Sequence, residues 1–346
     1  MTLLQTTEVL TMTRLILLTT LCALGLSAQT LKILAMGVAP EEIGEFQAVS
    51  NKVKIVPVTK ENVMREIVDA DAFIGTITAD MVRAGKKLRW TAIRSAGVET
   101  VLHKSGSTAL RDSNIILTNN QIVQGPEIAD HALAMLLALT RNIPKFIQMR
   151  ESGKWAGGRE GLLELKDKTA VVIGVGGIGY QIAIRAWAFG MKVIGVDPED
   201  MPMNPFVSRY VKPDQLNEVI PQADVVFISA PHTEKSHKMM GPQQFELMKK
   251  DSFFIAVSRG GIYDLPALVK ALDSKRIAGA GVDVTDPEPL PEGNSLWKFS
   301  NAIITPHIAG RSDKDADRML NTIKENIRRF AEGMPLINVV DKTKGY

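Results

Sequence analysis

Residues 169–179 read TAVVIGVGGIG, an apolar segment that runs into a cluster of glycines. Residues 170–173 are apolar without alternation, which is typical of a parallel strand covered on both faces. Gly174, Gly176 and Gly179 then follow in the spacing G-x-G-x-x-G. In that pattern the first glycine permits a tight turn, the second lets the backbone approach a pyrophosphate, and the third lets the next helix pack closely. The segment therefore predicts a strand, a phosphate-binding turn and the N-terminus of a helix.

A second apolar run, residues 192–196, ends at Asp197, about twenty residues beyond the glycines. A carboxylate at this place accepts hydrogen bonds from an adenosine ribose and repels a 2′-phosphate. Strand, spacing and acid together predict a dinucleotide site that prefers NAD to NADP. The alternative is a glycine turn in an ordinary α/β protein, with Asp197 as a helix cap.

Composition limits the classes of protein that this chain can belong to. Its 346 residues, 45% of them apolar, suffice for two domains with full cores. The formal charge of +3 comes without a basic block, so we expect no nucleic-acid partner. The only cysteine, Cys22, lies near the N-terminus. The rest of the chain therefore has no disulfide, cysteine metal site or cysteine nucleophile, and we predict no metal.

Residues 1–29 have the order of a secretory signal peptide. Arg14 precedes the apolar residues 15–26, and Ser27, Ala28 and Gln29 supply small residues for cleavage. The apolar part is too short for a comfortable membrane span, so we expect no stable membrane anchor. The prediction is a periplasmic or secreted protein; the alternative is a misassigned start or a disordered tail ahead of a cytoplasmic enzyme.

From Leu31 onward, short apolar runs alternate with polar segments that can form helices, which predicts an α/β fold. A buried helix is expected over residues 127–141, either crossing between two domains or packing between two copies of the chain. Its His131 is expected to be a core or interface residue. Residues 146–165, which contain several glycines, predict a loop. The candidate strands are residues 32–36, 53–58, 72–75, 91–94, 115–118, 170–173, 192–196, 223–230, 252–258, 277–284 and 302–307.

Arg259, Asp283 and His307 each stand at the end of a predicted strand, where open parallel sheets bind their ligands. The guanidinium fork of Arg259 suits a carboxylate and a neighbouring carbonyl. His307 can give or take a hydroxyl proton, and Glu288, between two prolines, could orient its ring. These residues predict a hydride-transfer site. The alternatives are a surface arginine, a solvated glutamate and a capping histidine.

Three segments resemble the signatures of the D-isomer-specific 2-hydroxyacid dehydrogenases: residues 257–264, residues 283–289 and residues 305–310. The resemblance also includes residues 95–98, the helix after Pro126 and the glycine turn, and it extends over roughly residues 30–340. It implies two Rossmann-like domains with doubly wound parallel sheets. The NAD-binding domain, residues 122–309, would be inserted into a discontinuous, flavodoxin-like substrate-binding domain formed by residues 30–121 and 310–346.

The resemblance also implies roles for particular residues. Arg259 would bind the substrate carboxylate and carbonyl oxygen, His307 would be the general acid/base, and Glu288 would be its partner. Gly97 and Val98 would offer backbone contacts to the carboxylate, and Asp283 would meet the nicotinamide carboxamide. The residues implied to bind the cofactor are Gly174, Gly176, Gly177, Ile178, Gly179, Asp197, Val257, Ser258, Asp283 and Gly310.

The function predicted in this way is the interconversion of a small D-2-hydroxy acid and its 2-oxo acid with NAD(H), of the glyoxylate or hydroxypyruvate type, by a homodimer. One alternative is a non-catalytic NAD(H)-binding sensor or scaffold. Another is oxidation of formate or phosphite, although Glu288 favours the hydroxyacid reaction.

Overall fold

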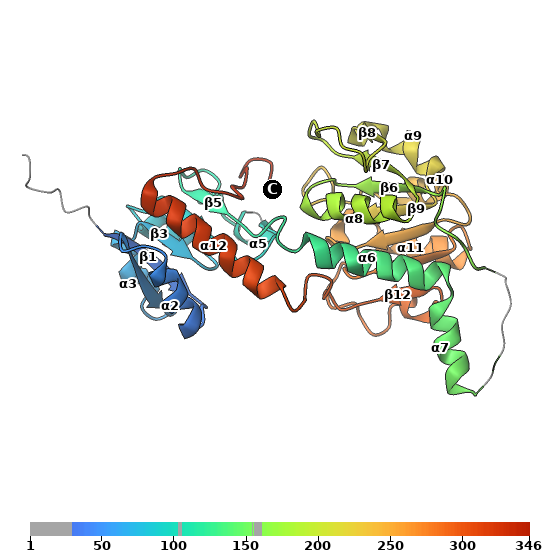
Figure 1. Cartoon of the computed structure of the whole chain (residues 1–346), viewed down its shortest axis with the longest axis horizontal. Helices are drawn as coiled ribbons and strands as arrows, with labels where there is room; N and C mark the ends of the chain where they lie inside the picture. Colours follow the sequence, from blue (N-terminus) through green and yellow to red (C-terminus); the bar gives the residue numbers. More distant parts are fainter. Residues whose placement is uncertain (1–29, 103–105, 154, 156–160) are drawn as a thin grey trace, which may run out of the picture.

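The structure is a computed structural model that describes residues 30–102, 106–153, 155 and 161–346. The predicted signal peptide, residues 1–29, lies outside the described residues. The described chain forms two parallel sheets, each with helices on its faces (Figure 1). The predicted α/β fold class is therefore confirmed. We call each sheet with its helices a unit, the first unit being the one that contains the N-terminal strand.

The first unit is built on five parallel strands in the order β2-β1-β3-β4-β5. The sheet starts in its interior at β1 and grows toward both edges, which is the doubly wound arrangement. Its strands are β1 (Leu31–Met36), β2 (Val53–Val58), β3 (Ala72–Ile74), β4 (Trp90–Ala92) and β5 (Ile116–Thr118). Its helices are α2 (Pro40–Ala48), α3 (Val63–Glu66), α4 (Ala79–Ala84), α5 (Glu99–Leu102) and α12 (Asp315–Glu332).

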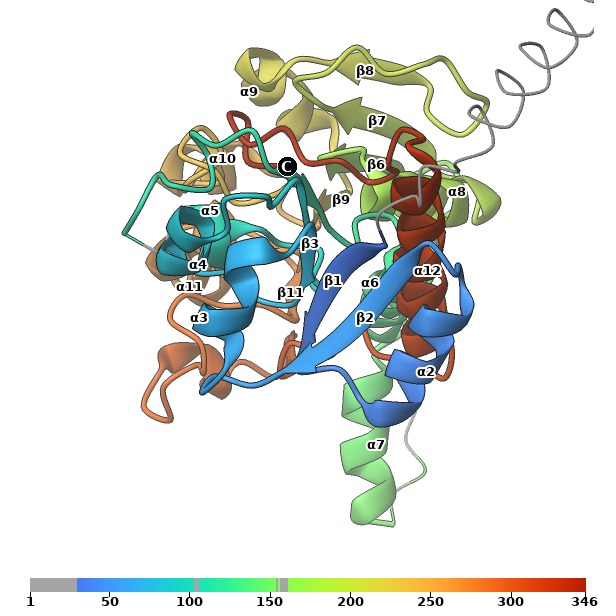
Figure 2. The same ribbon diagram turned by 90° about the vertical axis from the view of Figure 1, so that its left-hand side faces the viewer.

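Helix α12 returns to the first unit from the C-terminal part of the chain and lies beside α2 (Figure 2). Ile323 and Ile327 are buried in the same core cluster as Ile33 of β1. The ring of Phe330 packs 5.2 Å from that of Trp90, measured between centroids. The first unit is thus made of two chain segments, with the second unit between them in sequence.

The second unit has seven parallel strands in the order β12-β11-β10-β9-β6-β7-β8. The order reverses between β6 and β9, and such a switch point opens a ligand-binding crevice at the carboxyl ends of the strands. The strands are β6 (Thr169–Ile173), β7 (Lys192–Val196), β8 (Arg209–Val211), β9 (Val225–Ile228), β10 (Phe253–Ala256), β11 (Gly279–Val282) and β12 (Ala302–Ile304). The helices are α6 (Gly125–Thr140), α7 (Ile143–Glu151), α8 (Gly177–Ala188), α9 (Leu216–Val219), α10 (Pro242–Leu247) and α11 (Leu265–Asp273).

Helix α6 is the buried helix that the apolar sequence predicts. It packs along α8 and contacts β10, β11 and β12, so it lies against the second sheet over its length. The chain crosses between the units just before α6, in residues 119–124. Gly125 allows the start of α6 to lie close to the start of α8, because a Cβ at Gly125 would come within 2.8 Å of the carbonyl oxygen of Gly177.

Two elements differ from the sequence prediction. The loop predicted over residues 146–165 is wrong in its first part, because α7 continues to Glu151. Pro144 favours the start of a helix, and the first glycine comes only at Gly153. Strand β8 was not predicted, because three residues after a proline-rich connection carry almost no periodic signal.

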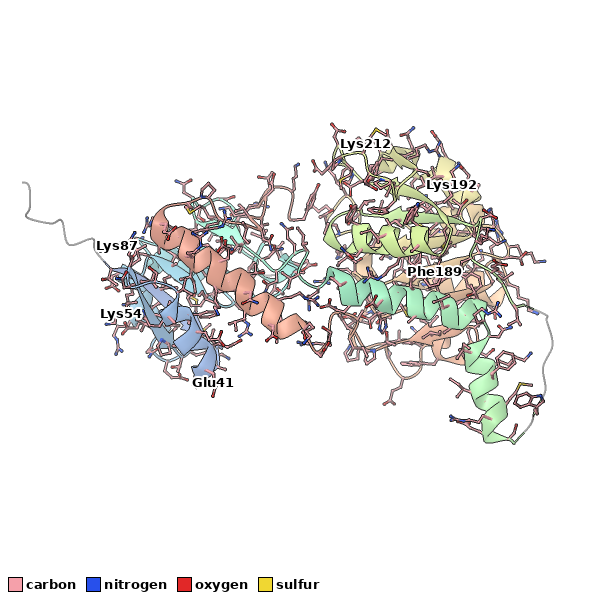
Figure 3. The ribbon with its side chains drawn as sticks, viewed as in Figure 1. Glu41, Lys54, Lys87, Phe189, Lys192 and Lys212 are labelled. Atoms are coloured by element: carbon pink, nitrogen blue, oxygen red, sulfur yellow. The ribbon has the colours of Figure 1, made fainter. Side chains whose placement is uncertain are left out.

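The outer surface carries charged side chains such as those of Lys54, Lys87 and Lys192 (Figure 3). Within the described ranges, no helix is long and apolar enough to span a membrane. The same residues contain no group of three or more histidine, cysteine or acidic side chains placed to hold a metal ion.

Candidate active site

A cleft of about 1570 Å³ is lined by residues of both units and lies beyond the carboxyl ends of β6 and β9. Pockets for drug-sized ligands are typically about 300–1,000 Å³, so this cleft has room for a larger molecule together with a small one. All the predicted site residues line it except Gly179 and Glu288. The fold thus brings together side chains from segments that are far apart in sequence.

The glycine turn has the conformation that its spacing predicts. Gly174 has a φ of +84°, and a Cβ there would collide with the backbone of Ala230 after β9. A Cβ at Gly179 would collide with the carbonyl of Gly174. Gly176 differs from both, because a Cβ there would meet no described atom within 4 Å. Its backbone therefore faces open space, which leaves room for a phosphate group at the N-terminus of α8.

Asp197 is buried at the end of β7 and is held by backbone groups on both sides. Its Oδ2 accepts a hydrogen bond from the N–H of Val175 at 2.7 Å, and its Oδ1 accepts one from the N–H of Glu199 at 2.9 Å. The carboxylate is therefore fixed between the glycine turn and the loop after β7. No described helix begins at this point, so Asp197 is not a helix cap.

Ser258 presents a polar atom with no partner. Its Oγ is buried and forms no hydrogen bond with any described residue, although the residue lines the cleft. A buried polar atom without a partner is costly, so this hydroxyl is suited to a ligand. Its neighbour Val257 also lines the cleft. Gly310 lines the cleft as well, and its carbonyl accepts a hydrogen bond from Nε2 of Gln124 at 2.8 Å.

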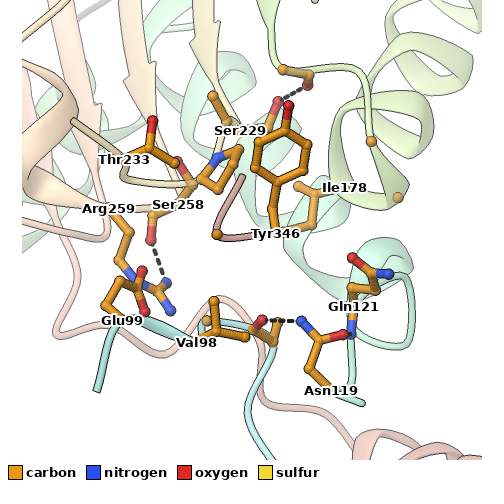
Figure 4. A pocket seen from close by; sticks show the side chains of 18 of the residues that line it. Val98, Glu99, Asn119, Gln121, Ile178, Ser229, Thr233, Ser258, Arg259 and Tyr346 are labelled. Atoms are coloured by element: carbon orange, nitrogen blue, oxygen red, sulfur yellow. Dashed lines mark hydrogen bonds and ion pairs between the residues drawn. The ribbon is translucent and has the colours of Figure 1, made fainter. Parts of the chain in front are cut away.

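Arg259 reaches across the cleft to the first unit (Figure 4). Its Nε donates to Oε1 of Glu99 at 2.8 Å, and its Nη1 donates to the carbonyl of Ser258 at 2.7 Å. A Cβ at Gly97 would collide with Nη2 of Arg259, so the guanidinium lies directly against the backbone at Gly97. The two segments that the resemblance implies for the substrate carboxylate thus lie side by side in the structure. Glu99 is a site residue that the sequence did not single out.

The turn after β4 is fixed by hydrogen bonds from two asparagines that the sequence also did not single out. Nδ2 of Asn119 donates to the carbonyl of Ala96 at 2.6 Å, and Nδ2 of Asn120 donates to that of Arg94 at 2.8 Å. Within the described chain, the N–H groups of Gly97 and Val98 donate to no acceptor. Both residues line the cleft, so the turn can offer donors to an anion.

His307 and Glu288 meet at the rim of the second sheet. Nδ1 of His307 lies 2.9 Å from Oε2 of Glu288, and the other carboxylate oxygen accepts the N–H of Thr285 at 3.0 Å. The two side chains are 46% and 39% exposed. His307 lines the cleft, so its Nε2 stays available while Glu288 fixes Nδ1.

Asp283 holds the turn that carries His307. Its Oδ1 accepts from Oγ1 of Thr305 at 2.6 Å and from the N–H of Ile308 at 3.0 Å, and its Oδ2 accepts from the N–H of Ala309 at 3.0 Å. Nε2 of His131 in turn lies 2.9 Å from Oγ1 of Thr305. The prediction for Asp283 was a contact with the cofactor; the structure assigns most of its hydrogen-bonding capacity to this turn.

The last residues of the chain also line the cleft, which no local pattern indicated. Oη of Tyr346 donates to Oε1 of Glu199 at 2.8 Å, and Nζ of Lys344 lies 2.7 Å from the same oxygen. These hydrogen bonds from Lys344 and Tyr346 hold the pKa of Glu199 below its usual range. The pKa of Tyr346 is raised, first by burial and then by Glu199. Figure 4 places the Tyr346 ring beside Ile178 and Ser229.

Comparison with known proteins identifies the kind of fold that carries this cleft. Residues 133–309 match the family model for the NAD binding domain of D-isomer specific 2-hydroxyacid dehydrogenases. The chain is 34% identical over 307 residues to a D-3-phosphoglycerate dehydrogenase of Methanocaldococcus jannaschii. That alignment covers 87% of this chain and 56% of the relative, so the chain spans about half of that protein's length.

A second relative is covered more fully. The chain is 30% identical to a glyoxylate reductase of Korarchaeum cryptofilum, over 83% of this chain and 87% of that protein. Among solved structures, the TT0316 protein of Thermus thermophilus is 30% identical and has a TM-score of 0.71. That match covers 90% of this chain and all of the other.

Proposed function

Because the chain belongs to the family of D-isomer specific 2-hydroxyacid dehydrogenases, we propose that it interconverts a small D-2-hydroxy acid and its 2-oxo acid. The proposed substrates are of the glyoxylate or hydroxypyruvate type, and the proposed redox partner is NAD(H). The observation that carries the proposal is the set of Arg259, His307 and the glycine turn around one cleft, with Glu288 hydrogen-bonded to His307.

The residues around the turn fit a dinucleotide. Gly176 leaves open space for a phosphate, and Ser258 has an unpartnered hydroxyl in the cleft. Asp197 lines the same cleft and is fixed there by the N–H of Glu199. We propose that the dinucleotide is held by Gly174, Gly176, Gly177, Ile178, Gly179, Asp197, Val257, Ser258, Asp283 and Gly310. The nicotinamide ring, when bound, supplies or accepts the hydride. Asp197 disfavours a 2′-phosphate by charge repulsion, which supports NAD over NADP.

The side chains of the chain itself perform the remaining tasks. Arg259 binds the substrate carboxylate, and the backbone of Gly97 and Val98 supports it from the first unit. His307 holds the proton that the substrate oxygen gains or loses at Nε2, because Glu288 engages its Nδ1. The positive charges near the oxygen stabilise the alkoxide as it develops. Asp283 acts as a positioning residue for His307 through the turn of residues 305–309.

We further propose that the two units divide these tasks. Residues 30–121 and 310–346 would form the substrate-binding domain, and residues 122–309 would form the NAD-binding domain. The core of the first sheet supports this division, since it contains side chains from residues 33–92 together with Ile323 and Ile327 of α12.

The direct test measures loss of NADH absorbance with glyoxylate, hydroxypyruvate, pyruvate and bulkier 2-oxo acids, with NADPH in parallel. We expect turnover on the small acids and a preference for NADH. Binding of NADH without turnover on any of them would contradict the proposal and favour a non-catalytic NAD(H)-binding protein.

We propose a homodimer formed through the second unit. Helix α7 projects from that unit (Figure 1), and each of its residues is at least partly exposed in the described structure. Ile143 and Ile147 on it are 45% and 47% exposed, so this helix offers apolar side chains that a second copy of the chain would cover. Light scattering at several concentrations would give the mass, and a monomer at all of them would contradict the proposal.

We also propose that residues 1–29 direct the chain to secretion and are then removed. The charged, apolar and small-residue order of that segment supports the proposal. Intact mass measurement of the protein from its natural cell would decide between a cleaved chain and an uncleaved, cytoplasmic one.

A further inference from the structure

Arg259 forms an ion pair with an acidic residue of the first unit, Glu99. Glu99 lies 160 residues away in sequence, and its Oε1 accepts a hydrogen bond from Nε of Arg259 at 2.8 Å. The side chains of Arg259 and Glu99 are 32% and 17% exposed, so the ion pair is half-buried within the cleft. A half-buried ion pair is less screened by solvent than a surface pair. Figure 4 shows the two groups facing each other where the units meet.

The carboxylate of Glu99 lies along one particular edge of the guanidinium. A Cβ at Gly97 would collide both with Nη2 of Arg259 and with Oε2 of Glu99, so these two atoms converge on the Gly97 backbone. With Oε1 on Nε, the carboxylate follows the Nε and Nη2 edge of the guanidinium. This edge binds carboxylates through two parallel hydrogen bonds. Glu99 therefore lies where an incoming carboxylate would pair with Arg259 beside Gly97.

Part of the remaining hydrogen-bonding capacity of Arg259 is also used. Nη1 already donates to the carbonyl of Ser258 at 2.7 Å. Two carboxylates on one edge would repel each other strongly in a partly desolvated cleft. An anion that pairs with the Nε and Nη2 edge of Arg259 beside Gly97 therefore requires Glu99 to move.

We propose that Glu99 is the resident counter-ion of the carboxylate site. In the ligand-free protein it neutralises Arg259, and substrate binding exchanges the Glu99 carboxylate for that of the substrate. The inference rests on the proposed function, because it takes Arg259 as the substrate anchor.

The position of Glu99 also favours one class of substrate. Glu99 directly follows Val98 in the chain, so it stays close to the site after the exchange and a second negative charge on the substrate meets its carboxylate there. The site selects 2-oxo acids with a neutral or hydroxylated side chain over dicarboxylates and phosphorylated acids.

The test replaces Glu99 by glutamine, which keeps the size and the hydrogen-bond acceptor but removes the charge. The first readout is binding of oxalate and of oxamate to the NADH complex, followed by NADH fluorescence. We expect Glu99→Gln to tighten oxamate binding about five- to tenfold and to tighten oxalate binding more, because oxalate carries the second charge. In turnover we expect KM for glyoxylate to fall and the preference over oxaloacetate to shrink, with kcat changed less than about threefold.

Two further variants test whether the charge of Glu99, and not its size or a general change in the unit, causes the effect. Glu99→Asp retains the charge on a shorter side chain, and we expect it to bind oxalate more weakly than Glu99→Gln does. Glu66→Gln is the matched control, because Glu66 lies in the same unit with a side chain 25% exposed and pairs with Lys32 instead. It should leave both anion affinities unchanged. Thermal unfolding and NADH affinity establish that each variant is folded.

Opposite results would overturn the inference. Unchanged or weaker oxalate binding in Glu99→Gln, with a lower kcat, would mean that Glu99 only orients Arg259. Absence of anion binding in both wild type and variant would also overturn it. These outcomes differ from failure of the proposed function, in which the wild-type protein turns over none of the 2-oxo acids. In that case tighter oxalate binding by Glu99→Gln would still support the counter-ion role.

Discussion

Nδ1 of His307 lies 2.9 Å from Oε2 of Glu288, and the contact joins two loops that follow neighbouring strands of the second sheet. Glu288 follows β11 and His307 follows β12. The carboxylate is itself held by the N–H of Thr285, so the imidazole is oriented by a group that is fixed in turn. A neutral ring with Nδ1 engaged in this way presents Nε2 to the cleft, which is the arrangement that proton transfer requires.

Replacing His307 with alanine should lower kcat about 10²- to 10⁴-fold, because a positioned acid/base contributes a factor of that size. The affinity for NADH should stay near normal, since the predicted dinucleotide contacts lie elsewhere. Steady-state kinetics and NADH fluorescence titration measure the two effects. His237→Ala is the control, because His237 pairs with His232 and does not line the cleft. Unchanged turnover in His307→Ala would remove His307 from the proposed reaction.

Replacing two glycines of the turn by alanine, one at a time, should distinguish an effect on NADH affinity from an effect on the stability of the fold. Gly176→Ala adds a methyl group in open space, so stability should stay unchanged while NADH affinity falls, because the methyl blocks the approach of a phosphate. Gly179→Ala forces a methyl group into the carbonyl of Gly174, so both stability and affinity should fall. Thermal unfolding and NADH titration of the pair check this. Equal NADH affinity in wild type and Gly176→Ala would place the phosphate elsewhere.

Asp283→Asn should destabilise the protein by about 2 kcal/mol, because an amide nitrogen would face a backbone N–H in place of an acceptor. The turn of residues 305–309 would lose its anchor, so kcat should fall more than KM rises. Urea unfolding and steady-state kinetics measure the two effects. The exposed Asp251→Asn serves as the control. A stable variant with normal kcat would show that the anchor of this turn lies elsewhere.

The contact between Glu199 and the C-terminal residues should depend on pH. Its hydrogen bonds from Lys344 and Tyr346 lower the pKa of Glu199 below the ordinary value of 4.5. A group with a lowered folded-state pKa stabilises the fold above its unfolded pKa, and that contribution is lost as pH falls through the folded value. Wild type should therefore unfold at a higher temperature than Glu199→Gln at neutral pH. The difference should disappear below the lowered pKa of Glu199.

Lys344 sets the alkaline limit of the same contact. The hydrogen bond to Glu199 raises the pKa of Lys344 above 10.5, so its contribution is complete below that pH and is lost only as pH rises through the raised value. A Lys344→Met variant should remove most of the difference between wild type and Glu199→Gln at neutral pH. Additive effects of the two substitutions would contradict a direct interaction.

The sequence by itself determined the features that depend on neighbouring residues. The apolar runs predicted most of the strands, and the spacing of Gly174, Gly176 and Gly179 predicted the turn, because burial and backbone sterics act within a few residues. Arg259 and His307 could be selected because each follows a predicted strand, and parallel strands end at one edge of a sheet. Strand β8 was not predicted, because a segment of three residues is too short for a periodic pattern to be detected.

The tertiary structure alone decided which side chains meet across the cleft. Glu99 pairs with Arg259 over 160 residues, and Glu199 meets Tyr346 over 147 residues. Asp283 accepts hydrogen bonds from Thr305 and from the backbone that follows His307, so it also positions that turn. A periodic pattern in the sequence does not predict such contacts, because they join residues that are brought together only when the whole chain is folded. The local pattern thus predicts the two units and the edge where ligands bind, and the packing of the units determines the charge that a ligand meets there.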